Sequence, residues 1–230
     1  MTAKVISFGN FKGGVGKTTA SVALGAELGR RGHKVVLLDF DIQGNATVNI
    51  SRAQSAEAKM PLDVRHLAAV VRSNPSGLSK IIKEVSAEAD YVICDTPGNI
   101  ESDGTQTAFI VADVVVVPLK PKAYDLDSTR QTLAVLRRVA EINPDVLIFL
   151  LKTMPERTVL NRSVDAAIQE LGADVLDTVI GDYVAFGEMG ATGTPLWELG
   201  RSARRANENI VAFTDELLAR LEAHLVSEAA

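Results

Sequence analysis

A glycine-rich loop between a strand-like segment and a helix-like segment constrains this chain more than any other feature. The loop reads GNFKGGVGKTT over residues 9–19 and directly follows the apolar segment Lys4–Phe8. Glycines let the backbone curl so that successive N–H groups point at phosphate oxygens, and the N-terminus of the following helix adds the positive end of its dipole. Lys17 is expected to reach the β- and γ-phosphates of a nucleotide, and the Thr18 hydroxyl to hold Mg²⁺. A Gly-rich turn without a ligand is the plainer alternative, and the adjacent lysine and threonine argue against it.

Short β-branched segments alternate with longer helical patterns over the rest of the chain. Strands are predicted at Lys4–Phe8, Val35–Asp39, Tyr91–Asp95, Val114–Leu119, Val146–Lys152 and Val175–Ile180, and helices include Thr18–Arg31, Asp125–Ile142 and Val159–Leu171. This alternation predicts an α/β fold with a doubly wound, mostly parallel sheet and helices on both faces. Ligands then bind at the carboxyl ends of the strands. Because no repeat or linker interrupts the pattern, we expect a single domain over residues 1–230.

Two further segments place carboxylates at that same edge of the sheet. Asp39 and Asp41 stand at the end of the second predicted strand, and their i, i+2 spacing directs both side chains to one side. Carboxylates there can order water around Mg²⁺ or orient an attacking water. Asp95 ends the next predicted strand and is expected to bond the water shell of Mg²⁺, with the N–H of Gly98 near the γ-phosphate. Turn hydrogen bonds at strand ends are the alternative for these acids.

The composition excludes several other classes of protein. The longest uninterrupted apolar run, Val146–Leu151, is far shorter than the roughly 20 residues that cross a bilayer, and no secretory signal is recognisable. Cys94 is the only cysteine, which excludes an intrachain disulfide and a multi-cysteine metal or iron–sulfur site; we expect it to fill space in the core. The net charge of −5 argues against nucleic-acid binding over the whole surface, so a DNA partner would need a local patch. We expect a cytoplasmic protein.

The loop departs from the common phosphate-loop pattern G-x-x-x-x-G-K-[ST], because Phe11 stands at its first glycine. It reads K-G-G-x-G-K-T-T instead, with a second lysine, Lys12, five residues before the first. This pattern resembles the deviant Walker-A ATPases, the group of P-loop NTPases that includes ParA, MinD and the nitrogenase iron protein. The resemblance implies an Mg²⁺-dependent ATPase whose ATP contacts come from Lys12, Gly13, Gly14, Val15, Gly16, Lys17, Thr18 and Thr19, with Gly98, and whose metal site involves Thr18, Asp39 and Asp95.

The same resemblance implies roles that the residues alone leave open. In this family the lysine equivalent to Lys12 reaches across an ATP-bound dimer to the partner's phosphates, so it implies ATP-dependent homodimerisation and a catalytic part for Lys12 beside Lys17. The family carries D-x-D-P-Q-G-N-A-T where this chain has residues 39–47, and its second aspartate is linked to hydrolysis, a catalytic role that passes to Asp41. Ile42 replaces the family's proline, which alters local stiffness and removes no functional group.

Within the family, the chain is similar to the small ParA type. Val117–Pro121, followed by Asp125, is similar to a segment of ParA-like partition ATPases, and no helix-turn-helix region precedes the first strand. This branch implies a nucleoid-associated ATPase that positions plasmid, chromosome or other cargo. Its ATP-bound dimer would bind DNA nonspecifically, and a small DNA- or cargo-binding partner protein would stimulate hydrolysis.

Two alternatives within reach of these motifs stay open. A MinD-like membrane ATPase would need a basic amphipathic C-terminal helix, whereas residues 206–230 carry five acidic residues and one arginine. An anionic leaflet would repel them, so no membrane partner is expected, and the apolar stripe Ile210, Phe213, Leu217, Leu221 and Leu225 should face the core. Ligases or kinases of the dethiobiotin synthetase type use similar loops but generally lack the lysine at the Lys12 position. A nitrogenase-reductase role fails on the cysteine count.

Candidate DNA contacts lie near the start of the last predicted helix, at Arg201, Arg204 and Arg205. Weaker candidates are Lys120, Lys122, Arg137, Arg138, Arg157 and Arg162. The alternative is that these residues form a solvated basic face that binds no DNA. If a helix begins near Ser202, Arg204 and Arg205 lie in its first turn, where cations oppose the helix dipole. A phosphate partner would offset that cost. Against DNA binding, residues 181–184 hold no arginine, where some relatives carry a DNA-contacting one.

Overall fold

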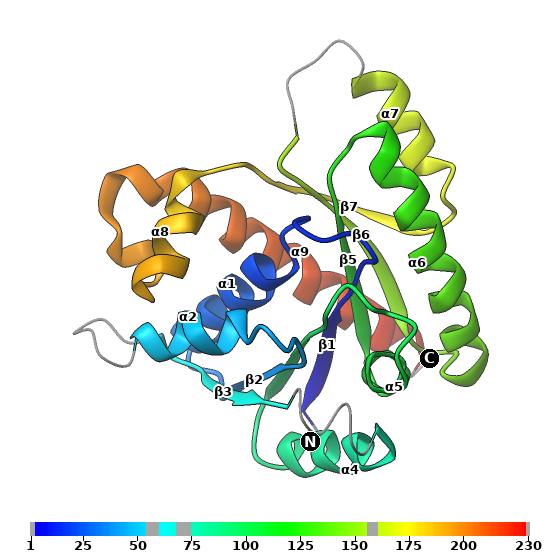
Figure 1. The fold of residues 1–230 in the computed structure, drawn as a ribbon, viewed down its shortest axis with the longest axis horizontal. Coiled ribbons are helices and arrows are strands. Elements are labelled where there is room, and N and C mark those ends of the chain that lie inside the picture. Colours follow the sequence, from blue (N-terminus) through cyan, green and yellow to red (C-terminus); the bar gives the residue numbers. More distant parts are fainter. Residues whose placement is uncertain (1–2, 54–59, 68–74, 156–160, 229–230) are drawn as a thin grey trace.

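The computed structural model describes residues 3–53, 60–67, 75–155 and 161–228. Within these ranges seven strands form one sheet in the order β3-β2-β4-β1-β5-β6-β7, and every neighbouring pair is parallel. The strands are β1 (Lys4–Phe8), β2 (Val35–Asp39), β3 (Asp63–His66), β4 (Tyr91–Asp95), β5 (Val114–Leu119), β6 (Leu147–Thr153) and β7 (Asp174–Ile180). The predicted α/β fold is confirmed, and this sheet is parallel throughout (Figure 1).

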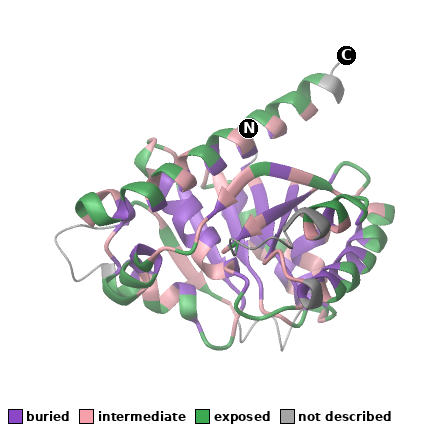
Figure 2. Cartoon of the chain, turned by 90° about the horizontal axis from the view of Figure 1, so that it is seen from above, coloured by how far each residue is buried: buried purple, intermediate pink, exposed green. Residues whose placement is uncertain are grey.

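Helices cover both faces of the sheet, as predicted for a doubly wound fold. One face carries α1 (Lys17–Arg30), α2 (Asn45–Ala53), α8 (Val184–Thr192) and α9 (Arg204–Glu228), with the short 3-10 turns η1 (Leu196–Glu198) and η2 (Gly200–Ala203). The other carries α4 (Pro75–Ser86), α5 (Asp103–Ile110), α6 (Ala123–Ile142) and α7 (Asn161–Gln169). Buried residues are concentrated in the sheet and on the inner sides of these helices (Figure 2).

The valine run of β5 shows why the core has two halves. Successive side chains of a strand point to opposite faces, so Val114 and Val116 pack with the layer that contains α1, and Val115 and Val117 pack with the layer that contains α6. All four side chains are 0% exposed. β5 is therefore apolar on both faces because both faces are covered, as expected for a central parallel strand.

The predicted strand boundaries agree with the structure to within one residue. The strands β1, β2, β4 and β5 have the predicted bounds, whereas β6 begins and ends one residue later and β7 begins one residue earlier than predicted. The edge strand β3 was not predicted. It pairs with β2 alone and its side chains are exposed or half-buried, so an apolar pattern is not needed there and none marks it. Cys94 is buried in β4, as expected for core filler, and burial raises the pKa of its thiol to about 12.

The predicted helices are also present, with shifted ends. α1 begins at Lys17 and α6 at Ala123, respectively one and two residues before the predicted starts. The predicted helix Val159–Leu171 corresponds to α7, and its first two residues lie outside the described ranges, as does Arg157.

The C-terminal helix α9 packs against β7 and α1. Four members of its apolar stripe, Ile210, Phe213, Leu217 and Leu221, are buried. The stripe was predicted to face the core over its full length, and this was wrong for Leu225, which is 39% exposed. Figure 2 shows the reason, because the last turns of α9 extend past the rest of the molecule. No helix in the described ranges is long and apolar enough to span a membrane.

Candidate functional site

The glycine-rich loop connects the end of β1, in the middle of the sheet, to the start of α1. Gly14 and Gly16 have φ of +70° and +89°, a left-handed conformation that favours glycine. A Cβ atom at Gly13 or Gly14 would meet no atom of the described residues within 4 Å. Val15 is buried and Thr19 half-buried, so they anchor the loop. The exposed part of the loop can therefore present its backbone to a ligand.

Lys17 is the first residue of α1, and its side chain lies beneath the loop. It is 9% exposed, and its Nζ donates to the carbonyl oxygens of Asn10 at 3.2 Å and Lys12 at 3.1 Å. Burial lowers the pKa of Lys17, whereas the carboxylates of Asp95 and Asp41 act to raise it. The loop thus holds a buried ammonium whose present partners are neutral carbonyl groups, which a phosphate oxygen can replace with a stronger charge-assisted bond.

Asp95 ends β4, which lies between β1 and β2. Its carboxylate is 1% exposed, and Oδ1 has no hydrogen-bond partner among the described residues. Burial raises the pKa of Asp95 to about 7; a hydrogen bond from Thr18 acts in the opposite direction, and the charge of Asp39 adds to the rise. A buried oxygen without a partner next to a threonine hydroxyl fits the water shell of a magnesium ion. Thr18 and Asp95 therefore have the chemistry predicted for the metal site.

Asp39 lies opposite Asp95 in the sheet, but its oxygens are already occupied. Oδ1 accepts the N–H of Asp41 at 3.1 Å, and Oδ2 accepts both the N–H and the hydroxyl of Thr47 at 2.8 Å. Asp39 thus joins the segment after β2 to the first turn of α2. Asp41 follows on this segment, and its Oδ1 accepts the N–H of Gln43 at 3.0 Å. Asp41 lies near enough to the loop for its charge to act on Lys17. Both oxygens of Asp39 accept hydrogen bonds from protein, whereas Oδ1 of Asp95 has no partner among the described residues.

Lys12 has a different environment from Lys17. Its side chain is 49% exposed, and its Nζ lies 3.6 Å from Oδ1 of Asp125, a buried carboxylate in the first turn of α6. The backbone N–H of Lys12 donates to Oδ1 of Asn10 at 2.9 Å. Lys17 is therefore held within its own loop, whereas Lys12 lies at the surface beside α6.

A buried polar cluster, which the sequence analysis did not predict, joins the first residues of the loop to α6. Asn10 is 0% exposed, and its Nδ2 donates to the carbonyl oxygen of Pro118 at 2.8 Å. The hydroxyl of Thr132 donates to the carbonyl oxygen of Ser128 at 2.8 Å, accepts the N–H of Phe11 at 3.1 Å and lies 3.3 Å from Oδ1 of Asn10. The signal was present in α6, where Asp125, Thr129 and Thr132 recur at helical spacing on a buried face.

Two other strand ends approach the loop. A Cβ at Gly98 would lie 3.1 Å from the carbonyl oxygen of Phe11, so the turn after β4 lies directly against the loop. At the end of β6, the hydroxyl of Thr153 lies 2.9 Å from the carbonyl oxygen of Val15. The next residue, Met154, has a φ of +48°. Gly98 was predicted, whereas Thr153 and Met154 carry no motif that would have marked them.

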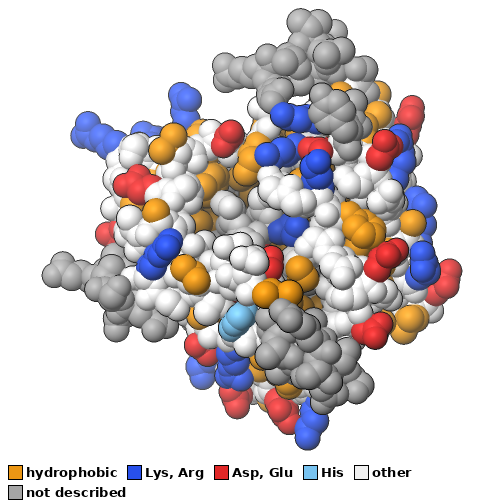
Figure 3. Space-filling view, viewed as in Figure 1, with side chains coloured by type: hydrophobic (Ala, Val, Ile, Leu, Met, Phe, Trp, Pro, Cys, Tyr) orange, Lys and Arg blue, Asp and Glu red, His pale blue; other side chains and the backbone are white. Residues whose placement is uncertain are grey.

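The three candidate DNA-binding arginines lie close together in the chain, in η2 and at the start of α9. Arg201 is in η2, and Arg204 and Arg205 open α9, as predicted for a helix that starts near Ser202. All three are exposed, and Nε of Arg204 donates to Glu208 at 2.8 Å. Basic side chains project from the upper left of Figure 3, where Figure 1 places α8 and the chain that leads to α9. Arg137 donates to the carbonyl oxygen of Leu171, so it is partly engaged within the fold.

The site combines a parallel sheet in an α/β fold, a glycine-rich loop with a buried lysine, and acidic residues at neighbouring strand ends. These features define a nucleotide-binding protein, and comparison with known proteins leads to the same class. Residues 6–196 match the family described as CobQ/CobB/MinD/ParA nucleotide binding domain. The chromosome-partitioning ATPase Soj of Thermus thermophilus is 32% identical, over 94% of this chain and 99% of that protein. The maintenance of carboxysome distribution protein A of Halothiobacillus neapolitanus is 27% identical, over 94% of this chain and 97% of that protein.

Solved structures share the fold. MinD of Aquifex aeolicus has a TM-score of 0.75 at 19% identity, over 94% of this chain and 97% of that one. The ATP complex of a Cyanothece McdA variant has a TM-score of 0.75 at 17% identity, over 94% and 96%. The chain belongs to the ParA/MinD family of nucleotide-binding ATPases, and within it to the ParA-like partition ATPases.

Proposed function

We propose that this chain binds Mg·ATP at the carboxyl ends of β1, β2 and β4, dimerises on ATP and hydrolyses it. The observation that carries the proposal is a convergence beneath one loop. The Lys17 ammonium is buried and donates to the carbonyl oxygens of Asn10 and Lys12, and a buried Asp95 oxygen has no partner among the described residues. Above them Gly13 and Gly14 are open. Each of these features gains a partner if a phosphate and a hydrated metal ion bind there.

Each residue of the site has its own part in binding or hydrolysing ATP. The backbone of residues 13–19 holds the phosphates, and Lys17 reaches the β- and γ-phosphates. Thr18 would hold Mg²⁺ directly and Asp95 would hold its water shell, where a bound ion would supply positive charge to neutralise the phosphates. Asp41 orients the attacking water, and Gly98 offers its N–H to the γ-phosphate. Asp39 supports Asp41 through the hydrogen bond that it accepts from the Asp41 N–H.

The position of Lys12 supports dimerisation. Lys17 already supplies the lysine within the loop, and Lys12 is half-exposed beside α6, where its Nζ lies 3.6 Å from Oδ1 of Asp125. A flexible ammonium at the surface can reach the phosphates of a second copy. This use of Lys12 also separates a dimerising ATPase from a small-molecule ligase, which needs no lysine from a partner.

The cargo is proposed from relatives and from surface charge. The two relatives named above are a chromosome-partitioning ATPase and a protein that maintains carboxysome distribution, so we propose that this chain positions a chromosome, a plasmid or a protein body in the cytoplasm. Exposed Arg201, Arg204 and Arg205 support nonspecific contact with nucleoid DNA. A small partner protein would stimulate hydrolysis. The buried stripe of α9 leaves Ile210, Phe213, Leu217 and Leu221 unavailable to a membrane.

Two lysine variants test the proposal. Lys17→Ala should lower ATP affinity by at least about 100-fold, because two charge-assisted bonds of roughly 1.5–3 kcal/mol each are lost. Lys12→Ala should bind ATP as a monomer yet fail to dimerise or hydrolyse. Nucleotide titration and light scattering with a slowly hydrolysed analogue measure both, and Lys34→Ala, at the opposite end of β2, is the control. Wild-type ATP affinity in Lys17→Ala would refute the site; dimerisation of Lys12→Ala would refute the role of Lys12.

A further inference from the structure

Residues 41–44 form a tight turn directly after β2, and a side chain from another strand contacts its backbone. Within the turn, the N–H of Gly44 donates to the carbonyl oxygen of Asp41 at 3.0 Å. Nε2 of His66 lies 2.9 Å from that same oxygen. His66 is the last residue of β3 and is paired with Asp39 of β2. β3 lies beside β2 at the edge of the sheet (Figure 1), and the imidazole of His66 reaches the turn from there.

The geometry specifies the hydrogen bond. A carbonyl oxygen only accepts, so Nε2 of His66 carries a proton and donates it. The Asp41 carbonyl then accepts two bonds, one from Gly44 and one from His66. The ring also lies over Gly44, where a Cβ would be 3.4 Å from Nε2. His66 therefore bonds one end of the turn and packs on the other.

Two further hydrogen bonds hold this segment: the N–H of Asp41 donates to Asp39 at 3.1 Å, and the N–H of Gln43 donates to the Asp41 carboxylate at 3.0 Å. Ile42 occupies its first central position, is 58% exposed and donates no backbone hydrogen bond to any described residue. Proline is favoured at that position because its ring sets φ near −65°. Isoleucine leaves φ free, so the conformation of the turn depends on its hydrogen bonds. A shift there moves Asp41, whose charge acts on Lys17 at the nucleotide site.

We propose that His66 is a positioning residue for Asp41: its hydrogen bond to the Asp41 carbonyl holds the turn that directs the Asp41 carboxylate toward the γ-phosphate. The inference rests on the proposed part of Asp41 in ATP hydrolysis. His66 touches neither nucleotide nor metal. Its effect is confined to turnover, because the loop that binds the phosphates belongs to β1 and α1, and β2 and β4 separate β1 from β3 in the sheet.

Kinetics distinguish this role from a general structural one. His66→Ala should lower kcat about three- to tenfold, the equivalent of one hydrogen bond of roughly 0.5–1.5 kcal/mol, with KM for ATP and ATP-dependent dimerisation unchanged. His66→Gln should keep most of kcat, because its terminal amide nitrogen can donate from near the Nε2 position. His66→Asn is one bond shorter and should behave as alanine. His33→Ala is the control, since His33 stacks edge-on against Tyr91 at the other end of β2.

A second variant supplies the missing rigidity by another route. Ile42→Pro presets the turn, so the double variant His66→Ala with Ile42→Pro should recover the kcat that His66→Ala alone loses. Structure is checked apart from activity by ¹⁵N NMR. In the wild type the ring should show a protonated Nε2, and exchange of the Gly44 amide should be faster in His66→Ala and slowed again in the double variant.

The outcomes separate this inference from the proposed function. If Asp41→Ala abolishes turnover and His66→Ala turns over as wild type, His66 does not position Asp41 and the ATPase proposal stands. A loss in His66→Ala that neither glutamine nor Ile42→Pro restores also overturns the inference. If Asp41→Ala itself hydrolyses ATP normally, the proposed role of Asp41 is wrong and the positioning role ends with it.

Discussion

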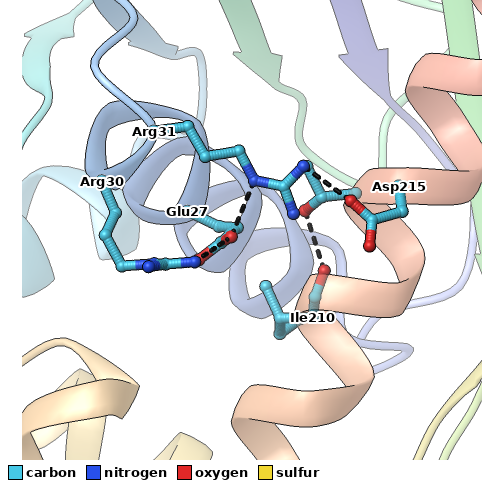
Figure 4. Close-up of polar contacts among 6 residues, drawn as sticks. Glu27, Arg30, Arg31, Ile210 and Asp215 are labelled. Carbon is cyan, nitrogen blue, oxygen red and sulfur yellow. Dashed lines mark hydrogen bonds and ion pairs between the residues drawn. The ribbon is translucent and has the colours of Figure 1, made fainter.

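Replacing Glu27 with glutamine should lower the stability of the fold, because this side chain is the buried centre of an ion-pair cluster (Figure 4). Glu27 is 1% exposed, and its two oxygens accept from Arg30 at 2.7 Å twice and from Nε of Arg31 at 2.8 Å. Nη1 of Arg31 donates in turn to Asp215 of α9 at 2.6 Å. The cluster thus joins the end of α1, the helix that begins at the phosphate loop, to the C-terminal helix.

The size of the effect follows from how far each partner is buried. Breaking a fully buried ion pair on one side costs about 3–5 kcal/mol. The side chains of Arg30 and Arg31 are 45% and 24% exposed, so both regain water when the carboxylate is lost. We therefore expect Glu27→Gln to lose about 2–3 kcal/mol at pH 7. For a chain of this length, that lowers Tm by roughly 4–12 °C.

The pH dependence gives the sharper test. Burial acts to raise the pKa of Glu27, but hydrogen bonds and charges from Arg30 and Arg31 outweigh it and lower the pKa below its usual 4.5. A lowered pKa means that the carboxylate stabilises the fold fully above about pH 4.5 and that this contribution is lost as the pH falls through the folded pKa. The stability gap between wild type and Glu27→Gln should therefore be constant from pH 7 to 5 and narrow in stronger acid.

Urea unfolding across this pH range measures the gap. Glu84→Gln is the matched control, since Glu84 pairs with Lys80 at i, i+4 on α4 with both side chains largely exposed, and it should cost no more than about 0.5 kcal/mol. A gap for Glu27→Gln that equals the control at pH 7, or that does not narrow in acid, would refute the reasoning.

Two predictions concern the site and the surface. Gly98→Ala should lower kcat for ATP several-fold and the free energy of unfolding by about 1 kcal/mol. The reason is that its Cβ would lie 3.1 Å from the carbonyl oxygen of Phe11, a backbone atom that can move little. Unchanged turnover would contradict this prediction. Arg204→Glu with Arg205→Glu should weaken ATP-dependent DNA binding and reduce its log–log salt slope by roughly 3–4 in the dimer. Mobility shifts at several salt concentrations measure this, Arg130→Glu on α6 is the control, and a double variant that binds like wild type would place the patch elsewhere.

The parts of the fold that sequence predicts are those where burial is repeated along the chain. Val114–Val117 is apolar at every position because helices cover both faces of β5, and that pattern is visible without coordinates. β3 shows the converse. Its residues Asp63 and His66 are exposed, so only its pairing with β2 makes it a strand. His66, the residue inferred to position Asp41, was missed for the same reason.

In the site, too, the sequence predicts some features and only the structure supplies others, as Asp39 and Asp95 show. Both are aspartates at the ends of apolar strands, both are buried, and they lie opposite one another in register. Nothing in their local sequence distinguishes them. Their neighbours do, because Thr47 and the Asp41 N–H occupy the oxygens of Asp39, while Oδ1 of Asp95 has no partner among the described residues. Leaving a buried carboxylate oxygen unpaired costs stability, and a ligand beside the Thr18 hydroxyl would remove that cost, which is why we propose the magnesium shell at Asp95 and not at Asp39.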